Sequence, residues 1–358
     1  MEEYCRHGTT DNSSFRIACK GNVIAVRHRL GKFLAAFVFA VAVLPLTPAT
    51  AGLAPGEGFV QVPGGPVWYR VFGSGTATPL VIVHGGPGMS SCIFDPLAAL
   101  VSQYRPVVVY DQLGSGRSGR PMDTSLWNAG RSVRELAAIR EALGLRKVHL
   151  MGHSWGGSVV ADYVITMRPA GVESVILAGP LLSTKLWIDD ANLLRAQLPA
   201  DVQEVLRSNE QAGTVQSKEY VAATKVFYDR FLYHQAEVKK PESCAQAPVN
   251  FEIYQMMWGP TEFHATGNLS TFDITPGLKQ LTMPTLFVVG RYDEARLETI
   301  AKFQAMIPGS IVKVLENSGH MAPLEEYDAY AVILEDFLRE VDNRSGGPSS
   351  PVRKHRTN

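Results

Sequence analysis

One short glycine-rich stretch in the middle of the chain limits the available folds more than any other feature. It reads Gly152-His153-Ser154-Trp155-Gly156-Gly157, after the apolar run Val148–Met151 and before the apolar stretch Ser158–Met167. A G-x-S-x-G sequence between strand and helix is typical of a nucleophile elbow, where small neighbours let the serine adopt a strained turn. We therefore predict an α/β sheet with Ser154 as a nucleophile at its carboxyl edge.

The rest of the chain alternates short β-branched runs with amphipathic stretches, which favours a mostly parallel α/β sheet. The predicted strands are Val67–Phe72, Leu80–Val83, Val107–Tyr110, Val148–Met151, Val175–Ala178, Thr285–Val289 and Ile311–Leu315. Val133–Leu143 has apolar residues at helical spacing and ends at Gly144, which predicts a helix. No convincing strand appears between about Leu181 and Thr282, so we predict a mostly helical insert there.

The N-terminal region has the order of parts of a signal peptide. Basic residues at 27–32 lead into the apolar run Phe33–Leu44, which is followed by Pro45 and Ala49-Thr50-Ala51. The run is shorter than the roughly 20 residues that span a bilayer. We expect cleavage near Ala51, export to the periplasm or the outside, and no stable membrane span; a membrane tether made by the uncleaved segment is the alternative. Residues 1–26 make the leader unusually long, and a start codon placed too far upstream would account for them.

These patterns divide the chain into five parts. We predict a leader with signal peptide over 1–51, an α/β core over 52–180 and 283–342, a helical cap over 181–282, and a disordered tail over 343–358. The tail contains Pro348, Pro351 and several basic residues, a composition that cannot build a packed core.

Charge and cysteine content exclude several classes of function. The 358 residues include 34 Lys and Arg and 34 Asp and Glu, so net charge gives no reason to expect a nucleic-acid partner. None of the four cysteines has the spacing of a metal site. After export, Cys92 and Cys244 would both reach an oxidising compartment. The sequence leaves open whether they form a disulfide or remain free thiols. Nothing in the sequence indicates an oligomeric state.

A serine nucleophile needs a histidine base and a carboxylate that orients the histidine. In a fold with this elbow the order along the chain is serine, acid, histidine. Asp293 and His320 lie in the loops just past the last two predicted strands, and carboxyl ends of parallel strands are where such sheets place their ligands. Asp273 competes as the acid, but it precedes a strand. We predict Ser154, Asp293 and His320 as the catalytic residues.

The loop His84-Gly85-Gly86-Pro87-Gly88 follows the predicted strand Leu80–Val83 and has almost no side chains. Acyl transfer by a serine creates an oxyanion that needs backbone N–H donors held in place beforehand. We predict the N–H groups of Gly86 and Trp155 as these donors. A phosphate-binding loop is disfavoured because no G-K-[ST] follows, and a purely structural turn is the remaining alternative.

Six motifs together resemble one family. They are HGGPG, YDQLGSGRS at 110–118, GHSWGG, MWGPTEF at 257–263, GRYDE and SGHM. Their order and spacing, from about Phe59 to Val341, resemble the proline iminopeptidases, in particular the branch with the archaeal tricorn-interacting aminopeptidase. The resemblance implies an α/β-hydrolase fold and an acyl-enzyme mechanism, without metal or cofactor, that releases an N-terminal residue, preferentially proline, from peptides.

The resemblance also implies an anchor for the free amino group of the peptide substrate. Glu262 in MWGPTEF and Glu294 in GRYDE match carboxylates that bind this group in the family, and a cationic amine leaving water needs such anions. Nearby residues at helical spacing either wall a proline pocket or belong to the core: Phe251, Tyr254, Met257 and Trp258.

Three alternatives stay open on sequence grounds. An amino-acid amidase or an esterase of broader range would use the same triad, and a binding protein would keep the pocket without turnover. An epoxide hydrolase is disfavoured because its elbow nucleophile is Asp.

Asp111 and Gln112, which match a DQ pair of the family, have either a structural role in their loop or a catalytic one.

Overall fold

The computed structural model describes residues 53–344 and 346. The predicted signal peptide, its cleavage near Ala51 and most of the predicted tail lie outside the described residues. The last two residues of the last helix, α10 (Tyr327–Arg344), lie within the predicted tail. Within 53–344, no helix is both long enough and apolar enough to cross a membrane.

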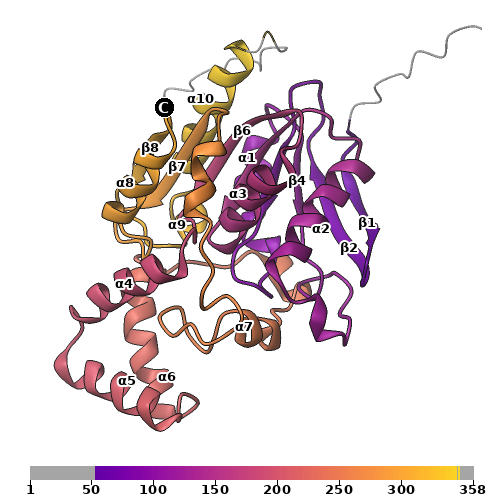
Figure 1. Ribbon diagram of the computed structural model, residues 1–358. Coiled ribbons are helices and arrows are strands. Elements are labelled where there is room, and N and C mark those ends of the chain that lie inside the picture. The colour runs from indigo at the N-terminus through magenta and orange to yellow at the C-terminus, as the bar shows by residue number, and fades with distance from the viewer. Residues whose placement is uncertain (1–52, 345, 347–358) are drawn as a thin grey trace, which may run out of the picture. The chain divides into compact units, whose positions relative to one another are not determined.

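Within the described residues, eight strands form one sheet in the order β1-β2-β4-β3-β5-β6-β7-β8 (Figure 1). The strands are β1 (Gly56–Val62), β2 (Gly65–Phe72), β3 (Leu80–Val83), β4 (Val107–Tyr110), β5 (Val148–His153), β6 (Val172–Ala178), β7 (Thr285–Gly290) and β8 (Ile311–Leu315). β2 pairs antiparallel with β1 and with β4, and the remaining pairings are parallel. This mostly parallel sheet with inserted helices confirms the predicted fold class.

β1 is the strand that the sequence patterns do not predict. Its sequence, GEGFVQV, has two glycines and no apolar run, and most of its residues are exposed. It forms at the edge of the sheet because the Pro63-Gly64 turn folds the chain back, so that Val62 pairs with Gly65. Gly64 has a φ of +106°, which favours glycine.

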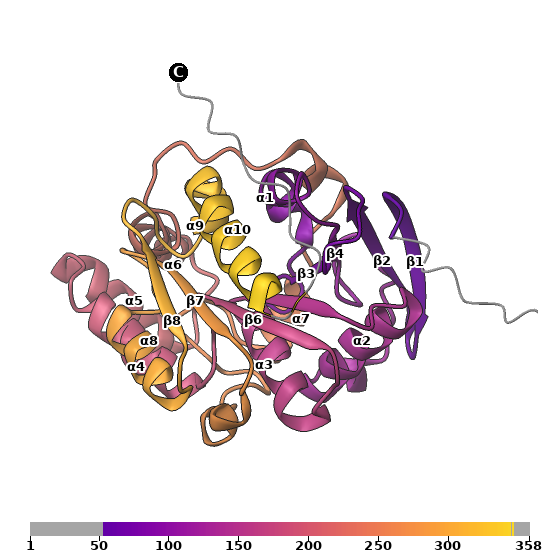
Figure 2. The ribbon, with the colours of Figure 1, turned by 90° about the horizontal axis from the view of Figure 1, so that it is seen from above.

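Helices cover both faces of the sheet, as Figure 2 shows. They are α2 (Ala129–Ala142), α3 (Trp155–Met167) and α8 (Leu297–Met306) on one face, and α1 (Asp95–Val101) and α10 on the other. In β4, Val108 and Tyr110 belong to the first core cluster, and Val107 and Val109 belong to the second. Both faces of β4 are therefore buried, which explains why its sequence has no polar alternation.

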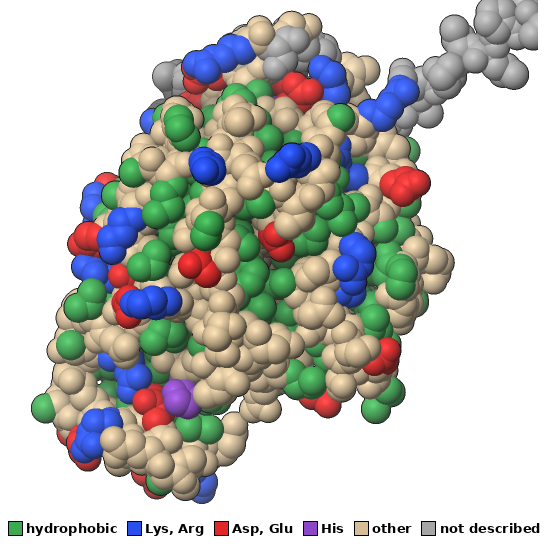
Figure 3. Space-filling view, in the orientation of Figure 1, with side chains coloured by type: hydrophobic (Ala, Val, Ile, Leu, Met, Phe, Trp, Pro, Cys, Tyr) green, Lys and Arg blue, Asp and Glu red, His purple; other side chains and the backbone are tan. Residues whose placement is uncertain are grey.

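The segment between β6 and β7 forms helices and two isolated β-bridges in place of a strand. Its α-helices are α4 (Thr184–Arg195), α5 (Ala200–Ala212), α6 (Lys218–Phe227) and α7 (Phe251–Met257). They lie together below the sheet in Figure 1. This segment has a hydrophobic cluster of its own, which includes Leu206, Tyr220 and Phe227. On the face shown in Figure 3, Lys and Arg side chains are interspersed with Asp and Glu side chains.

Candidate active site

Ser154 occupies the sharp turn between β5 and α3. Its φ of 54° and ψ of −121° are unusual for a residue with a side chain, and such a conformation costs about 1–3 kcal/mol. The turn is tight, because a Cβ on Gly152 would lie 2.1 Å from the Gly156 carbonyl oxygen. A Cβ on Gly156 would lie 2.1 Å from the Val83 carbonyl oxygen. The glycines around the serine are therefore required by the space that the turn leaves.

The predicted base and acid contact each other. His320 Nδ1 lies 2.8 Å from Asp293 Oδ1, and both side chains are buried. The same oxygen accepts a hydrogen bond from the Ala295 N–H at 2.8 Å, which orients the carboxylate. With its proton on Nδ1, a neutral imidazole has Nε2 free to accept a proton. Asp273, the competing acid, is exposed and accepts hydrogen bonds from Thr275 within its own turn.

A cavity of about 390 Å³ joins several of the predicted residues. Its lining includes Ser154, His320, Gly86 and Glu262, and its size is within the usual range for small-molecule sites. Trp155, the other predicted oxyanion donor, is buried beside it. The structure thus gathers the predicted nucleophile, base, loop glycine and one glutamate around a single cavity.

The HGGPG loop lies against the serine. A Cβ on Gly85 would lie 2.8 Å from Ser154 Cβ, and Gly86 has a φ of +44°, which favours glycine. On the other side of the serine, Trp155 is the first residue of α3. The first-turn N–H groups of a helix have no acceptor within the helix. The two predicted donors therefore flank Ser154.

Gln112 links these two sides of the serine. Its backbone N–H donates to His84 Nε2 at 2.9 Å, and its side-chain amide donates to the His84 carbonyl oxygen at 2.9 Å. Its Oε1 accepts a hydrogen bond from Trp155 Nε1 at 3.2 Å. Asp111 holds the next segment of the loop by accepting from the Ser91 N–H and hydroxyl. Both members of the DQ pair thus position the loop.

Carboxylates dominate the electrostatics of His320. Burial lowers the pKa of His320, but the carboxylate of Asp293, with those of Glu294 and Glu262, outweighs burial and raises this pKa to about 9. His320 Nε2 lies 4.0 Å from Glu294 Oε1. A cation that neutralised the two glutamates would therefore lower the pKa of His320 toward its usual range.

The two glutamates form an acidic pair in which Glu294 is buried and Glu262 is half-buried. Glu294 is 1% exposed, and neither of its carboxylate oxygens has a hydrogen-bond partner in the part of the chain described here. Burial, and then the charges of Glu262 and Asp293, raise the pKa of Glu294 well above its usual value. Burial also raises the pKa of Glu262, which lines the cavity. Unused acceptors on buried anions fit a cationic group with several N–H donors.

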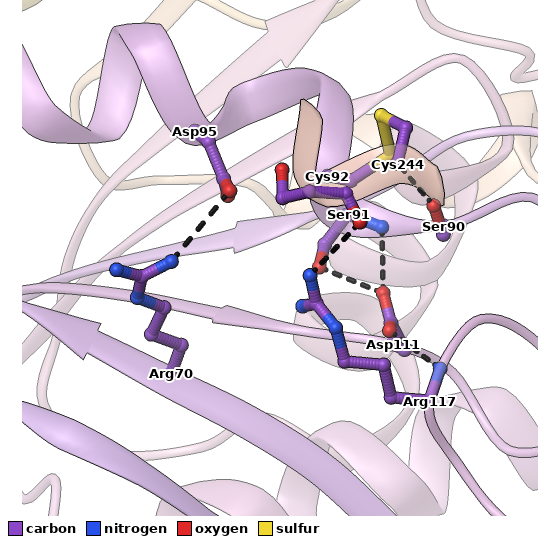
Figure 4. The surroundings of a disulfide bond; sticks show 9 residues. Arg70, Ser90, Ser91, Cys92, Asp95, Asp111, Arg117 and Cys244 are labelled. Carbon is purple, nitrogen blue, oxygen red and sulfur yellow. Dashed lines mark hydrogen bonds and ion pairs between the residues drawn. A yellow bond between two sulfur atoms is a disulfide. The ribbon is translucent and has the colours of Figure 1, made fainter. Parts of the chain in front are cut away.

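Cys92 and Cys244, whose pairing the sequence does not decide, form a disulfide (Figure 4). Cys92 lies in a 3-10 helix, Ser91–Phe94, shortly after the HGGPG loop, and Cys244 lies in the segment between α6 and α7. Both line the cavity. The disulfide therefore joins the core to the insert at the wall of the site.

Comparison with known proteins decides the family. The alpha/beta hydrolase fold family matches residues 78–327. A proline iminopeptidase from Heyndrickxia coagulans is 45% identical over 289 residues, which cover 80% of this chain and 99% of that relative. The chain belongs to the proline iminopeptidase family of serine hydrolases.

Two further members of the proline iminopeptidase family support this assignment. A proline iminopeptidase from Clostridium botulinum is 34% identical over 292 residues, which cover 80% of this chain and 99% of that relative. The crystal structure of a proline iminopeptidase from Mycobacterium smegmatis aligns with a TM-score of 0.74 and 31% identity, covering 81% of this chain and all of that one. The resemblance therefore extends over the sheet and the insert.

Trp187 and His153 also contact His320, and the sequence patterns predict a role for neither of them. The Trp187 ring meets the His320 ring edge-on at 5.4 Å between centroids, and its Nε1 donates to the Glu262 carbonyl oxygen at 3.0 Å. His153 Nε2 lies 2.9 Å from the His320 carbonyl oxygen. Burial lowers the pKa of His153 to about 3, so its ring is neutral. Trp187 comes from the insert, where no motif marks it, whereas His153 lies within the elbow motif itself.

The four residues at helical spacing before Glu262 have two different locations: three pack in the core and one lines the cavity. Tyr254, Met257 and Trp258 belong to the hydrophobic core, whereas Phe251 lines the cavity. Phe251 starts α7 and is 66% exposed, so only this one of the four residues reaches the site.

Gly179, directly after β6, lies against the Asp293–His320 pair. Its φ is +46°, and a Cβ there would lie 2.8 Å from Asp293 Oδ2 and 3.0 Å from His320 Nδ1. We expect Gly179→Ala to displace this pair and to lower kcat by about 10- to 100-fold, because small misplacements of reacting groups have effects of this size. Steady-state kinetics on an amino-acyl naphthylamide measure the change.

Gly213 supplies the matched control. It has a φ of +69°, but a Cβ there would meet no atom of the described residues within 4 Å. Gly213→Ala therefore adds backbone strain without contact at the site, and it should lower the melting temperature and leave kcat unchanged. An equal loss of kcat in both variants would show that backbone strain, and not the contact with Asp293 and His320, is responsible.

Proposed function

We propose that this enzyme is a serine exopeptidase that releases N-terminal proline from peptides. The observation that carries the proposal is the buried Glu294, neither of whose carboxylate oxygens has a hydrogen-bond partner among the described residues. Its Oε1 lies 4.0 Å from His320 Nε2, and His320 lines the same cavity as Glu262 and Ser154. A free amino group placed there would supply the missing donors, and a substrate without that group would leave both anions unpaired. The relatives named above are called proline iminopeptidases.

The geometry supports an acyl-enzyme mechanism. Ser154 Oγ attacks the carbonyl carbon of the first residue, and His320 Nε2 takes the hydroxyl proton while Asp293 stabilises the imidazolium. The carbonyl electron pair moves to oxygen, where the N–H groups of Gly86 and Trp155 hold the oxyanion. His320 then gives its proton to the leaving nitrogen, the C–N bond breaks, and the peptide lacking its first residue departs. Water, deprotonated by His320, releases the amino acid from Ser154 by the reverse route.

The pKa of His320 predicts a specific pH profile. Only neutral His320 accepts the serine proton, so kcat/KM, which reports the free enzyme, should rise with pH until about 9. A bound ammonium group neutralises the glutamates that raise this pKa. The corresponding limb in kcat, which reports the substrate complex, should therefore lie at lower pH than the limb in kcat/KM. Coincident limbs would contradict the placement of the amine beside Glu262 and Glu294.

A substrate panel tests the proposed function against its alternative, a broader amidase or esterase. The panel comprises proline naphthylamide, alanine naphthylamide, N-acetylproline naphthylamide and a simple acyl ester. We expect proline naphthylamide to be the best substrate and N-acetylation to lower kcat/KM by about 100-fold or more, because it removes the cation from a buried ionic site. Fast ester turnover with no sensitivity to N-acetylation would establish the alternative.

We also propose that the enzyme belongs to the branch that resembles the tricorn-interacting aminopeptidase. The support is the stretch Met257–Phe263, which carries Glu262, and the Asp293-Glu294 pair. A free amino group on peptides of several lengths should then suffice for turnover. Comparable kcat/KM values on prolyl tri- and pentapeptides would support this assignment, and a loss of activity beyond dipeptides would contradict it.

We further propose that the enzyme is exported after cleavage near Ala51. The order of residues in 27–51 supports this, and so does the Cys92–Cys244 disulfide, since such bonds persist in oxidising compartments. Mass spectrometry of the protein from separated cell fractions tests the proposal. The expected result is an exported form that begins at Gly52, and an intact N-terminus in the membrane fraction would favour the tethered alternative.

A further inference from the structure

The cavity at Ser154 has opposite charges among its lining residues. Glu262 supplies a carboxylate and Lys240 supplies an ammonium group. Among the lysines of the described residues, Lys147, Lys185 and Lys225 form ion pairs, and Lys240 does not. Lys240 therefore adds a positive charge to a cavity that the carboxylate of Glu262 also lines.

Lys240 lies between this cavity and a second one. The second cavity, of about 490 Å³, shares Tyr233 and Lys240 with the first. It also contains Lys225, whose charge is matched by Asp229. The two cavities therefore adjoin at Tyr233 and Lys240.

The chain that follows Lys240 is anchored to the core; we call residues 240–250 the strap. Cys244 is bonded to Cys92, and the Pro248 carbonyl oxygen accepts a hydrogen bond from Arg120 Nη2 at 2.7 Å. At the end of the strap, the Asn250 N–H donates to the Gly88 carbonyl oxygen at 2.7 Å. These anchors hold the chain that follows Lys240 at the wall of the cavity, and the Lys240 side chain is exposed.

We infer that Lys240 is a specificity-determining residue that binds the free carboxylate of prolyl dipeptides. The inference rests on the proposed function, which places the amino group at Glu262 and Glu294 and the scissile carbonyl at Ser154. In a dipeptide the carboxylate follows the scissile bond by only a few atoms, so the zwitterion matches the two charged regions of the cavity. In a longer peptide the carboxylate passes into the second cavity, and the preference for a free acid should decline.

The test compares kcat/KM for prolylglycine with kcat/KM for prolylglycinamide. The wild-type enzyme should favour the free acid by about three- to fivefold, which is the range expected of an exposed ion pair. Lys240→Gln should abolish this preference through KM. Lys239→Gln is the matched control, because Lys239 is exposed and lines neither cavity. The wild-type preference should also decline as salt screens the pair.

The outcomes separate this inference from the proposed function. A free-acid preference that survives in Lys240→Gln, or that disappears equally in Lys239→Gln, would overturn the role of Lys240. Hydrolysis of proline naphthylamide, which has no carboxylate, is measured on the wild type in parallel. Failure of the wild type to hydrolyse it would overturn the proposed function itself.

Discussion

Ser154→Ala should lower kcat on proline naphthylamide by about 10⁴- to 10⁶-fold, the range found when a triad nucleophile is removed. The residual rate would come from binding and from the oxyanion donors, which the substitution leaves in place. Purified variant is assayed at high enzyme concentration, and circular dichroism verifies its fold. Activity near the wild-type level would show that another residue is the nucleophile.

A second substitution at this position separates activity from strain. Glycine adopts a φ of 54° without the cost that a side chain imposes, whereas alanine retains that cost. Ser154→Gly should therefore be as inactive as Ser154→Ala but more stable, by about 1 kcal/mol once the greater freedom of unfolded glycine is subtracted. Urea unfolding of the two variants measures the difference. Equal midpoints would mean that the elbow stores no strain.

Glu294→Gln should lower kcat/KM for proline naphthylamide by about 10²- to 10³-fold, because loss of one partner of a buried charge pair costs about 2–5 kcal/mol. Glu262→Gln should act in the same direction. Neither variant should lose activity on N-acetylproline naphthylamide, which has no cation to pair. Glu298→Gln, at an exposed position on α8, is the control and should match the wild type. Equal losses on the free and acetylated substrates would contradict an amine-binding role.

The same substitution should stabilise the free enzyme. Because the pKa of Glu294 is raised above the unfolded value of 4.5, folding disfavours its ionised form. Glu294→Gln should therefore have little effect on the free energy of unfolding below pH 4.5. Its advantage over the wild type should grow as the pH rises toward the folded pKa. Unfolding curves at several pH values measure this, and an advantage that shrinks with rising pH would contradict the buried-anion interpretation.

Local patterns in the sequence predict most of the sheet and miss one of its two edge strands, β1. β3 and β4 have the predicted bounds because apolar β-branched runs identify strands buried inside a sheet. β8, the half-exposed strand at the other edge, also has its predicted bounds, because its valines and isoleucine favour a strand. β1 depends on a turn and on pairing with β2, and its exposed, glycine-containing sequence carries no such signal. The same distinction explains why the helical insert is visible mainly as a gap between strands.

The site shows a comparable division between local and long-range signals. Ser154, Asp293 and His320 follow from motif and order, because each occupies the loop after a predicted strand. Gly179, Trp187 and Lys240 belong to none of the motifs, and their relation to the site arises from contacts between segments far apart in the chain. Glycine after a strand in a fold with this elbow is the one signal that would have drawn attention to Gly179.

The disulfide turns part of the polypeptide into a closed ring, since it joins residues 152 positions apart. Ser154 lies within that ring, whereas Asp293 and His320 lie outside it. A protease that cut the exposed turn at Gly213-Thr214 would therefore open the ring without dividing the molecule. Such nicked enzyme should migrate as one species on a non-reducing gel and as two fragments after reduction. A single cut in the insert therefore leaves the fragment that carries Ser154 covalently attached to the fragment that carries Asp293 and His320.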